Sequence, residues 1–503
     1  MTREVFVKGL FALFFSGIFA WMVFYQDSHS NRDINRQRYL PYISGLLLPL
    51  CVLTILSSAL ILTGAERAME ITLSFCFGVF LHICLYYLLL MPALPFLRRH
   101  ISARACAVLW MLPNYLYLTQ MNYMRLPRPR WVIEVPLILV QVLPAVWLAG
   151  FLGVLGWKIL SHLTFRRRIL RDAFPITDPA VLAIWRQETE AARFHKPKLR
   201  LAVSPKIPTP LSIGLFRRSV RVVLPNRDYT PEELALIFRH ELVHIGREDS
   251  WNKFFLVFCS AMCWFNPLMW MAVKRSSEDL ELSCDETVLL DSDDDVRRRY
   301  ADLLLKTAGD ERGFSTCLSA SANALCYRLR SVADPKKKPS GALVVGLVFF
   351  LLCMSCGYAA LAYGQSTGAE VIYKSGPQEE YVLRSTGGDD LVCTDETALH
   401  RYLSSLPMEH ISGNYSFAPE GRSLFLIFDT PEGVLAVTLS DRFLKLVPLY
   451  GKANVQYYYL PDGIDWDGLS EYMAERPPQN ASMPPEGRMN GAEISRHPCP
   501  MSV

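Results

Sequence analysis

The sequence contains thirteen cysteines, but it has no two Cys-x-x-Cys pairs at zinc-binding spacing and no pattern that suggests a disulfide framework. Many of these cysteines lie in apolar runs, where a small buried hydrophobic residue is the expected role. No small-residue cleavage site clearly follows the first apolar run, so a removable signal peptide is not expected. The paired, interrupted apolar segments of transporter repeats are also missing, which argues against a transporter.

Charged residues make up only 20% of the chain, whereas hydrophobic residues make up 51% and the mean hydropathy is +0.18. This composition is too apolar for an ordinary soluble protein. Long apolar runs predict membrane-spanning helices at residues 9–25, 42–63, 71–94, 135–157 and 343–363. Residues 105–123 are ambiguous because they contain Pro113, Asn114 and Gln120. The sequence therefore predicts four or five spans before the central region and one span after it.

Basic residues near the ends of the expected spans indicate how the chain is oriented. Three arginines at residues 166–168 follow the span at 135–157, and three lysines at residues 336–338 precede the last span. Both clusters favour a cytoplasmic location for the region between them. If residues 105–123 also span, the N-terminus lies outside, at the cost of placing Arg125, Arg128 and Arg130 there as well.

The region after the last expected span differs in charge from the rest of the chain. From residue 364 onward it holds 10 Lys and Arg against 19 Asp and Glu, which agrees with an extracytoplasmic location. Strands are expected at residues 423–428, 434–439 and 455–460, and short helices at residues 396–403 and 467–474. These elements predict a small α+β domain. Residues 477–503, rich in Pro, Asn, Gly and Ser, are expected to be disordered.

The central region holds the pattern His240-Glu241-Leu242-Val243-His244. Upstream, Thr230-Pro231-Glu232-Glu233 is typical of a capping box with proline at the first helical position, so we expect the pattern on a helix. Histidines four residues apart share a helix face and can bind one metal ion, and Glu241 can take a proton from a water molecule on that metal. The alternative is a capped surface helix with two unrelated histidines.

A third ligand is expected on the helix that starts at Asn266-Pro267, because catalytic zinc usually keeps three protein ligands and one open position. Glu281 and Asp285 lie four residues apart and share a face of that helix. One carboxylate could bind zinc while the other holds a ligand histidine in its tautomer. Glu278 as the ligand, or Glu281 as an ordinary solvated charge, are the alternatives.

Residues 251–271 lie between the two halves of this pattern and are apolar enough to span a membrane. A full crossing would leave Glu281 and His244 on opposite sides. We therefore expect a buried core helix, or one that dips into the inner leaflet, with the active site at the membrane surface.

Further motifs accompany this pattern in a fixed order: Thr209-Pro210, Gly214, Val222-Val223-Leu224-Pro225, Asp249, Phe265-Asn266-Pro267-Leu268 and Glu281-Leu282-Ser283-Cys284-Asp285. The series resembles the BlaR/MecR-type integral-membrane zinc metallopeptidases over about residues 149–335. The resemblance implies a gluzincin-like fold, with a short sheet, including residues 201–203 and 220–224, to which a substrate strand can add. It implies that His240, His244 and Glu281 bind zinc, that Glu241 is the catalytic base, and that Asp285 supports a ligand histidine.

The antibiotic sensors of this family carry an outer penicillin-binding domain, which needs a Ser-x-x-Lys nucleophile. That motif does not occur after Tyr363. Sensing of β-lactams is therefore not supported, and the ligand of the outer domain is unknown.

The sequence predicts a multi-span α-helical membrane protein with an inserted α+β zinc metallopeptidase domain. The expected parts are a transmembrane domain (1–160), a cytoplasmic peptidase domain (161–340), a last span (341–364), an extracytoplasmic domain (365–476) and a tail (477–503). The expected function is a zinc endopeptidase in the lipid bilayer that cleaves a cytosolic transcriptional repressor, or itself, in response to an outer signal. Direct nucleic-acid binding is not expected, and a homodimer is left open. The alternative is a non-proteolytic receptor or scaffold with a structural metal site.

Overall fold

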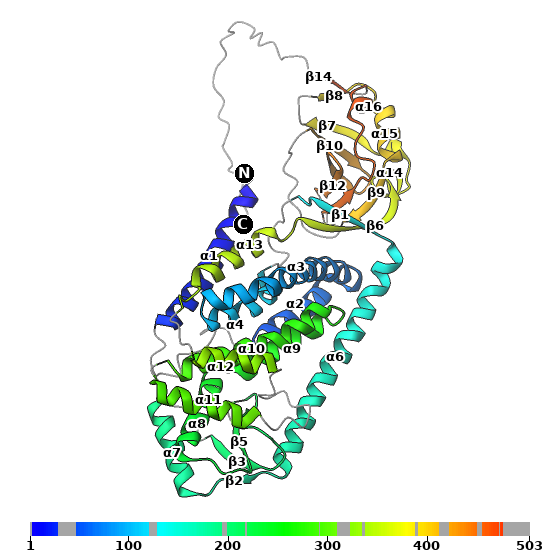
Figure 1. Ribbon diagram of the computed structural model, residues 1–503. Coiled ribbons are helices and arrows are strands. Elements are labelled where there is room, and N and C mark those ends of the chain that lie inside the picture. Colours follow the sequence, from blue (N-terminus) through cyan, green and yellow to red (C-terminus); the bar gives the residue numbers. More distant parts are fainter. Residues whose placement is uncertain are drawn as a thin grey trace, which may run out of the picture.

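The computed structural model describes residues 3–28, 47–119, 128–193, 199–216, 219–290, 292–308, 322–333, 338–387, 391–411, 422–449, 455–471 and 473–475. These residues form an elongated molecule (Figure 1). An eight-stranded sheet lies at one end, apolar helices lie in the middle, and a four-stranded sheet with its own helices lies at the other end. The long helix α6 (Leu137–Arg171) runs along one side and connects the two ends.

Three helices are long and apolar enough to cross a membrane in the part of the chain that the structure describes. Their apolar segments are Val5–Tyr25 in α1 (Arg3–Ser28), Cys76–His100 in α3 (Ala65–His100) and the whole of α6. The helices predicted at 9–25, 71–94 and 135–157 are therefore confirmed. The predicted span at 42–63 contains α2 (Leu47–Thr63), whose apolar segment is shorter.

The prediction of a span at residues 343–363 is wrong in its second half. Helix α13 (Ala342–Ser355) has 14 residues, which corresponds to about 21 Å, whereas the apolar core of a bilayer is about 30 Å thick. Gly357 has a φ of 87°, in the left-handed region that ends helices. From Ala359 the chain forms β6 (Ala359–Thr367), whose backbone pairs with a strand on each side.

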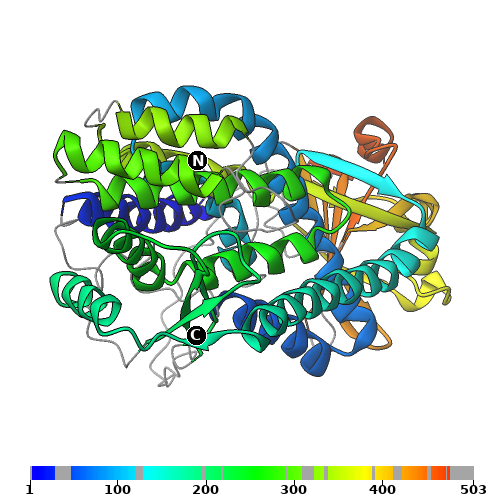
Figure 2. The same cartoon turned by 60° about the horizontal axis from the view of Figure 1, so that its bottom comes forward.

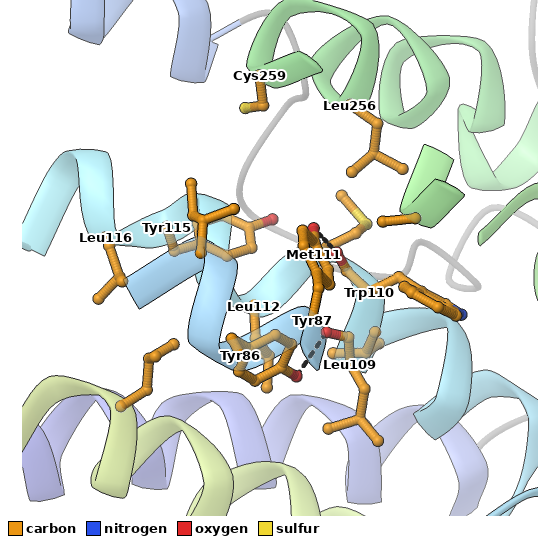
Figure 3. Packing of buried hydrophobic residues seen from close by; sticks show 14 of the residues in the cluster. Tyr86, Tyr87, Leu109, Trp110, Met111, Leu112, Tyr115, Leu116, Leu256 and Cys259 are labelled. Atoms are coloured by element: carbon orange, nitrogen blue, oxygen red, sulfur yellow. Dashed lines mark hydrogen bonds between the residues drawn. The ribbon is translucent and has the colours of Figure 1, made fainter. Parts of the chain in front are cut away.

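Residues 105–123 do not form one long helix. The chain here folds as α4 (Ala103–Met111), the 3₁₀ turn η2 (Leu112–Tyr115) and α5 (Leu116–Thr119), and residues 120–123 lie outside the described residues. All residues of α4 and η2 are buried. The hydroxyls of Tyr86 and Tyr87 in α3 donate to the carbonyls of Leu109 (2.7 Å) and Trp110 (2.9 Å), as Figure 3 shows. This segment is buried among the apolar helices. Its described residues contain no helix long enough to form the additional span considered at residues 105–123.

The eight-stranded sheet has the order β1-β6-β9-β13-β12-β11-β10-β7. Its first pair, β1 (Trp131–Val135) and β6, is parallel, and every other pair is antiparallel. The remaining strands are β7 (Val382–Gly387), β9 (Pro407–Ile411), β10 (Ser423–Thr430), β11 (Gly433–Ser440), β12 (Phe443–Pro448) and β13 (Gln456–Tyr459). Short elements accompany them: α14 (Gly368–Val371), η3 (Gln378–Glu380), α15 (Glu396–Ser405), α16 (Trp466–Ser470), and the paired strands β8 (Leu391–Cys393) and β14 (Met473–Glu475).

The strands predicted at 423–428, 434–439 and 455–460 and the helix at 396–403 are confirmed. The helix predicted at 467–474 ends at Ser470, because residues 473–475 form β14. Strand β1 was not predicted. It precedes α6 in the sequence, whereas the other seven strands follow α13.

The four-stranded sheet has the order β2-β3-β5-β4, formed by β2 (Phe174–Pro175), β3 (Arg200–Ser204), β5 (Arg221–Pro225) and β4 (Leu211–Ile213). The predicted strands at 201–203 and 220–224 are β3 and β5, and both are interior strands. The helices of this part of the chain are α7 (Pro179–Ala191), α8 (Pro231–Arg247), α9 (Asp249–Met262), α10 (Pro267–Val288), α11 (Asp294–Ala308) and α12 (Ala322–Ala333). Helices α9 and α10 lie toward the apolar helices in Figure 1, and the sheet end is turned forward in Figure 2. Val222 and Leu224 of β5 share a buried cluster with Phe238 and Leu242 of α8.

Residues 251–271 form most of α9, a turn and the start of α10. Phe255, Phe258 and Cys259 of α9 are buried in one apolar cluster with α3 and α4, which agrees with both predicted forms, a buried core helix or a helix that dips into the inner leaflet. The turn contacts α6, where the indole ring of Trp264 packs so closely on Gly150 that a Cβ there would lie 2.2 Å from the ring. The metal-site helices are therefore packed directly against the apolar helices.

Candidate metal centre

Helix α8 carries His240, Glu241 and His244, and its start is fixed by the predicted capping box. The Thr230 side chain accepts a hydrogen bond from the Glu233 amide (3.3 Å), and the Glu233 carboxylate accepts one from the Thr230 amide (3.0 Å). Both histidines and Glu241 are buried. These three residues therefore do not lie on an exposed helix face, as the alternative of a capped surface helix would require.

Three donor atoms converge between α8 and α10. The Nε2 atoms of His240 and His244 lie 3.1 Å apart, and Oε2 of Glu281 lies 3.4 Å from each of them. A tetrahedral zinc ion with bonds of 2.0–2.1 Å has ligand atoms about 3.3 Å apart. Oε2 of Glu281 is buried and has no hydrogen-bond partner within the described residues. The spacing and the unused oxygen both fit a single small cation.

Helix α10 is joined to α8 by Arg247, which is only 1% exposed. Its guanidinium donates to the hydroxyl and the carbonyl of Ser283, both at 3.2 Å, and to the hydroxyl of Thr287. At its start, α10 is capped by Asn266, whose side chain accepts from the Leu268 amide (3.0 Å). These contacts fix the register that brings Glu281 to the histidines.

The far side of each imidazole ring is held by a carboxylate, directly or through a hydroxyl. Nδ1 of His244 donates to Oδ2 of Asp249, at 2.6 Å. The Tyr300 hydroxyl donates to Oδ1 of Asp285 (2.6 Å), so its oxygen is left to accept from Nδ1 of His240, at 2.9 Å. The direct distance from Nδ1 of His240 to Asp285 is 3.6 Å, too long for a hydrogen bond. Both rings thus present Nε2 to Glu281.

The charge balance of the site favours a cation. Burial lowers the pKa of His240, but Cys284 and Glu281 outweigh burial and raise it to about 10. The pKa of His244 is also raised, because Cys284, Glu281 and Asp249 outweigh its burial. Burial alone would raise the pKa of Glu281, yet the neighbouring His244 and His240 bring it well below the usual value. Acidic groups therefore lie around the two imidazole rings, and Glu281 among them faces both Nε2 atoms, an arrangement that suits a divalent metal ion.

Cys284 is a competing donor that sequence reasoning missed. Its sulfur and the donor atoms of the two histidines all lie within 4.8 Å of one another. The sulfur contacts Nδ1 of His240 at 3.4 Å and the His240 carbonyl at 3.5 Å, on the side of the ring where Tyr300 lies. Glu281 is equidistant from both Nε2 atoms, and we consider it the better third ligand.

The two other glutamates named from the sequence, Glu241 and Glu278, line different cavities. Glu241 lines an apolar pocket with His240, and its buried Oε2 has no hydrogen-bond partner within the described part of the chain. Glu278, the alternative ligand, lines a different cavity with Arg98 and Asp279. Sequence reasoning also missed Tyr300 and the roles of Asp249 and Arg328. Asp249 lies five residues after His244, a spacing that could have suggested contact.

The part of the chain that contains these residues is similar to known proteins. Residues 127–330 match the family model described as BlaR1 peptidase M56. Regulatory protein BlaR1 of Bacillus licheniformis is 29% identical over 214 residues, which cover 41% of this chain and 35% of that protein. Methicillin resistance mecR1 protein of Staphylococcus aureus is 29% identical over 118 residues, which cover 23% of this chain and 20% of that protein. The chain thus spans about a third or less of the length of these curated relatives. Residues 127–330 are thus similar to the BlaR1 peptidase M56 family, in a chain that resembles BlaR/MecR-type proteins and has helices long and apolar enough to cross a membrane.

Proposed function

We propose that the chain is a membrane-embedded zinc endopeptidase with a gluzincin-like catalytic domain. The observation that carries this proposal is the convergence of Nε2 of His240, Nε2 of His244 and Oε2 of Glu281 within 3.1–3.4 Å of one another. These three side chains would hold zinc, while Asp249 and the Tyr300–Asp285 pair orient the two rings. When bound, zinc supplies a Lewis acid that polarises the scissile carbonyl and lowers the pKa of a water molecule.

Glu241 is the base of the proposed reaction. Its carboxylate accepts a proton from the attacking water as that water adds to the scissile carbonyl, and then delivers the proton to the leaving amine. The free carboxylate oxygen in a largely apolar pocket supports this role, because few neighbouring groups compete for it.

The substrate would bind as an extended peptide along β4, which is the edge strand of the four-stranded sheet next to β5. Two pockets adjoin this strand. One is largely apolar and is lined by Pro210, Leu236, Ile237, His240, Glu241, Tyr300, Leu303, Leu304, Thr307 and Arg328. The other is lined by Leu199, Ser212, Gly214, Leu215, Val220, His244, Ile245, Glu248, Ser250 and Trp251. Because one contains His240 and the other His244, they would receive side chains from the two sides of the scissile bond.

We further propose that this peptidase domain lies on the cytoplasmic side and the eight-stranded sheet on the other. The basic clusters at 166–168 and 336–338 and the acidic C-terminal region support this orientation. One relative is a regulatory protein by name. The proposed substrate is accordingly a cytosolic transcriptional repressor, or the chain itself, cleaved in response to an outer signal.

One observation favours a second candidate function, a receptor with a structural metal site. If Cys284 and Glu281 both bound the metal with the two histidines, four protein ligands would close the site. Replacement of Cys284 by serine separates the two functions. If this variant binds zinc as tightly as the unchanged chain, Cys284 is not a ligand and the fourth position remains open for catalysis. If it loses as much zinc affinity as a variant of a ligand residue, Cys284 is a ligand and the site is closed.

Glu241→Gln tests the proposed activity. The purified full chain in detergent would keep one zinc per chain, measured by metal analysis. Cleavage of casein and of the chain itself would fall about 10²–10⁴-fold, the usual contribution of a general base. Glu232→Gln, on the exposed first turn of the same helix, is the matched control and would cleave normally. Full activity in Glu241→Gln would refute the assigned base.

A further inference from the structure

Arg328 is a buried cation that reaches the metal site from a distant part of the chain. It lies on α12, is 3% exposed, and packs against α10. Its Nε donates to Oδ2 of Asp285 (2.6 Å) and its Nη2 donates to Oδ1 (2.8 Å). Two parallel hydrogen bonds from one guanidinium fix both the position and the plane of the carboxylate.

The same guanidinium also faces the third ligand. Nη1 of Arg328 lies 3.8 Å from Oε2 of Glu281, the oxygen that lies between the two histidines. One side chain therefore contacts both carboxylates that α10 presents to the site. It neutralises the buried charge of Asp285 and limits the repulsion between Asp285 and Glu281.

The effect of Arg328 extends to a histidine through two further side chains. Asp285, held by Arg328, accepts from the Tyr300 hydroxyl, and that hydroxyl accepts from Nδ1 of His240. If Asp285 rotated, the Tyr300 hydroxyl would lose its acceptor and could donate to His240 instead. The neutral imidazole of His240 would then carry its proton on Nε2 instead of Nδ1. Nε2 would no longer have a lone pair available to bind a metal.

We propose that Arg328 is a positioning residue that sets how tightly the site holds its metal, acting through Asp285 and Tyr300 on His240 and directly on Glu281. This inference rests on the proposed zinc site. It also gives that site a connection to the apolar helices, because α12 is followed by α13, and α13 leads into β6. The segment before α13 is anchored where Ser102 donates to the carbonyls of Pro339 and Ser340, both at 3.0 Å.

The test measures zinc affinity of the full chain in detergent by competition with a chelator. We expect Arg328→Gln to weaken zinc binding about 10–100-fold and Tyr300→Phe about tenfold, as loss of an outer partner usually does. Arg328→Lys should fall between Arg328→Gln and the unchanged chain, because the ammonium restores charge but not the paired hydrogen bonds. The absorption spectrum of the Co²⁺-loaded chain should change in the same variants, because the orientation of His240 changes.

Arg98→Gln is the control, because it breaks the other Arg–Asp pair that α10 forms, between the partly buried Arg98 of α3 and the buried Asp279. It should lower thermal stability while zinc affinity and the Co²⁺ spectrum stay unchanged. Equal losses of affinity in Arg98→Gln and Arg328→Gln would mean a merely structural role and would overturn the proposal. So would affinity within twofold of the unchanged chain in Tyr300→Phe, a variant that decides the matter if Arg328→Gln does not fold.

These measurements can also distinguish failure of the proposed endopeptidase activity from failure of the proposed role of Arg328. If the unchanged chain binds one zinc but cleaves neither casein nor itself, the endopeptidase proposal fails, whereas the affinity series still decides the role of Arg328. If the unchanged chain binds no zinc, both are overturned.

Discussion

The two faces of α10 have the same chemistry but different neighbours. Asp285 on one face is paired with Arg328 of α12, at 2.6 Å, beside the candidate metal centre. Asp279 on the other face is paired with Arg98 at the end of α3, at 2.6 Å, and also accepts from the indole of Trp110 in α4, at 2.6 Å. One buried Arg–Asp pair thus supports the metal site, and the other fastens the same helix to the apolar helices. The same helix therefore contacts both the candidate metal centre and the apolar helices.

The largest effect that distinguishes the faces should come from the proposed third ligand. Glu281→Gln should weaken zinc binding by more than about 100-fold, since a direct ligand contributes more than an outer partner. Glu278→Gln, one turn away and lining the Arg98 cavity, is the control and should bind zinc normally. Metal content and chelator competition measure both. A larger loss in Glu278→Gln would assign the third ligand to Glu278 instead of Glu281.

A smaller effect is expected on the face that contacts the apolar helices. Asp279→Asn should lower the free energy of unfolding by about 2 kcal/mol, less than full loss of a buried ion pair because the amide oxygen still accepts a hydrogen bond. Zinc affinity should remain unchanged. Thermal unfolding in detergent, followed by circular dichroism, measures the first quantity. If zinc binding weakened in proportion to stability, the two faces would not be separable.

The smallest of these effects concerns the other histidine. Asp249→Asn replaces the carboxylate that accepts from Nδ1 of His244 by an amide, and should weaken zinc binding about tenfold. Asp294→Asn makes the same substitution at an exposed position in the first turn of α11 and serves as the control, which should bind zinc normally. An unchanged zinc affinity in Asp249→Asn would show that the position of Asp249 is not needed to orient His244.

The parts of the site that could be predicted from sequence are those set by local rules. Helical spacing placed His240 with His244 and Glu281 with Asp285, and capping residues located the starts of α8 and α10. Tyr300 and Arg328 could not be found in this way. They belong to helices 60 and 43 residues away from their partners His240 and Asp285, and isolated tyrosine and arginine residues carry no motif.

The fold shows the same division between local and distant information. Alternation of apolar residues predicted β10 and β11, whose hydrogen-bonded neighbours are close in sequence. The short α13 and the strand β6 that follows it form one continuous apolar run in the sequence. A buried strand and an apolar helix have similar compositions, so the run was predicted as a single helix. Strand β1 depends on a partner more than 200 residues downstream, and a short segment gives no sign of such a partner.

The parallel pairing of β1 with β6 closes a very large loop. Trp131 to Val135 lie beside Ala359 to Tyr363, residue for residue, so the chain that enters α6 and the chain that leaves α13 are fastened together at one sheet edge. Most of the segment that matches the peptidase M56 family model, residues 127–330, lies between these two strands in the sequence. Sliding the strands by a single residue would displace α6 against α13 by about 3.3 Å. A binding event that favoured one register would therefore pull on both ends of the peptidase domain at once.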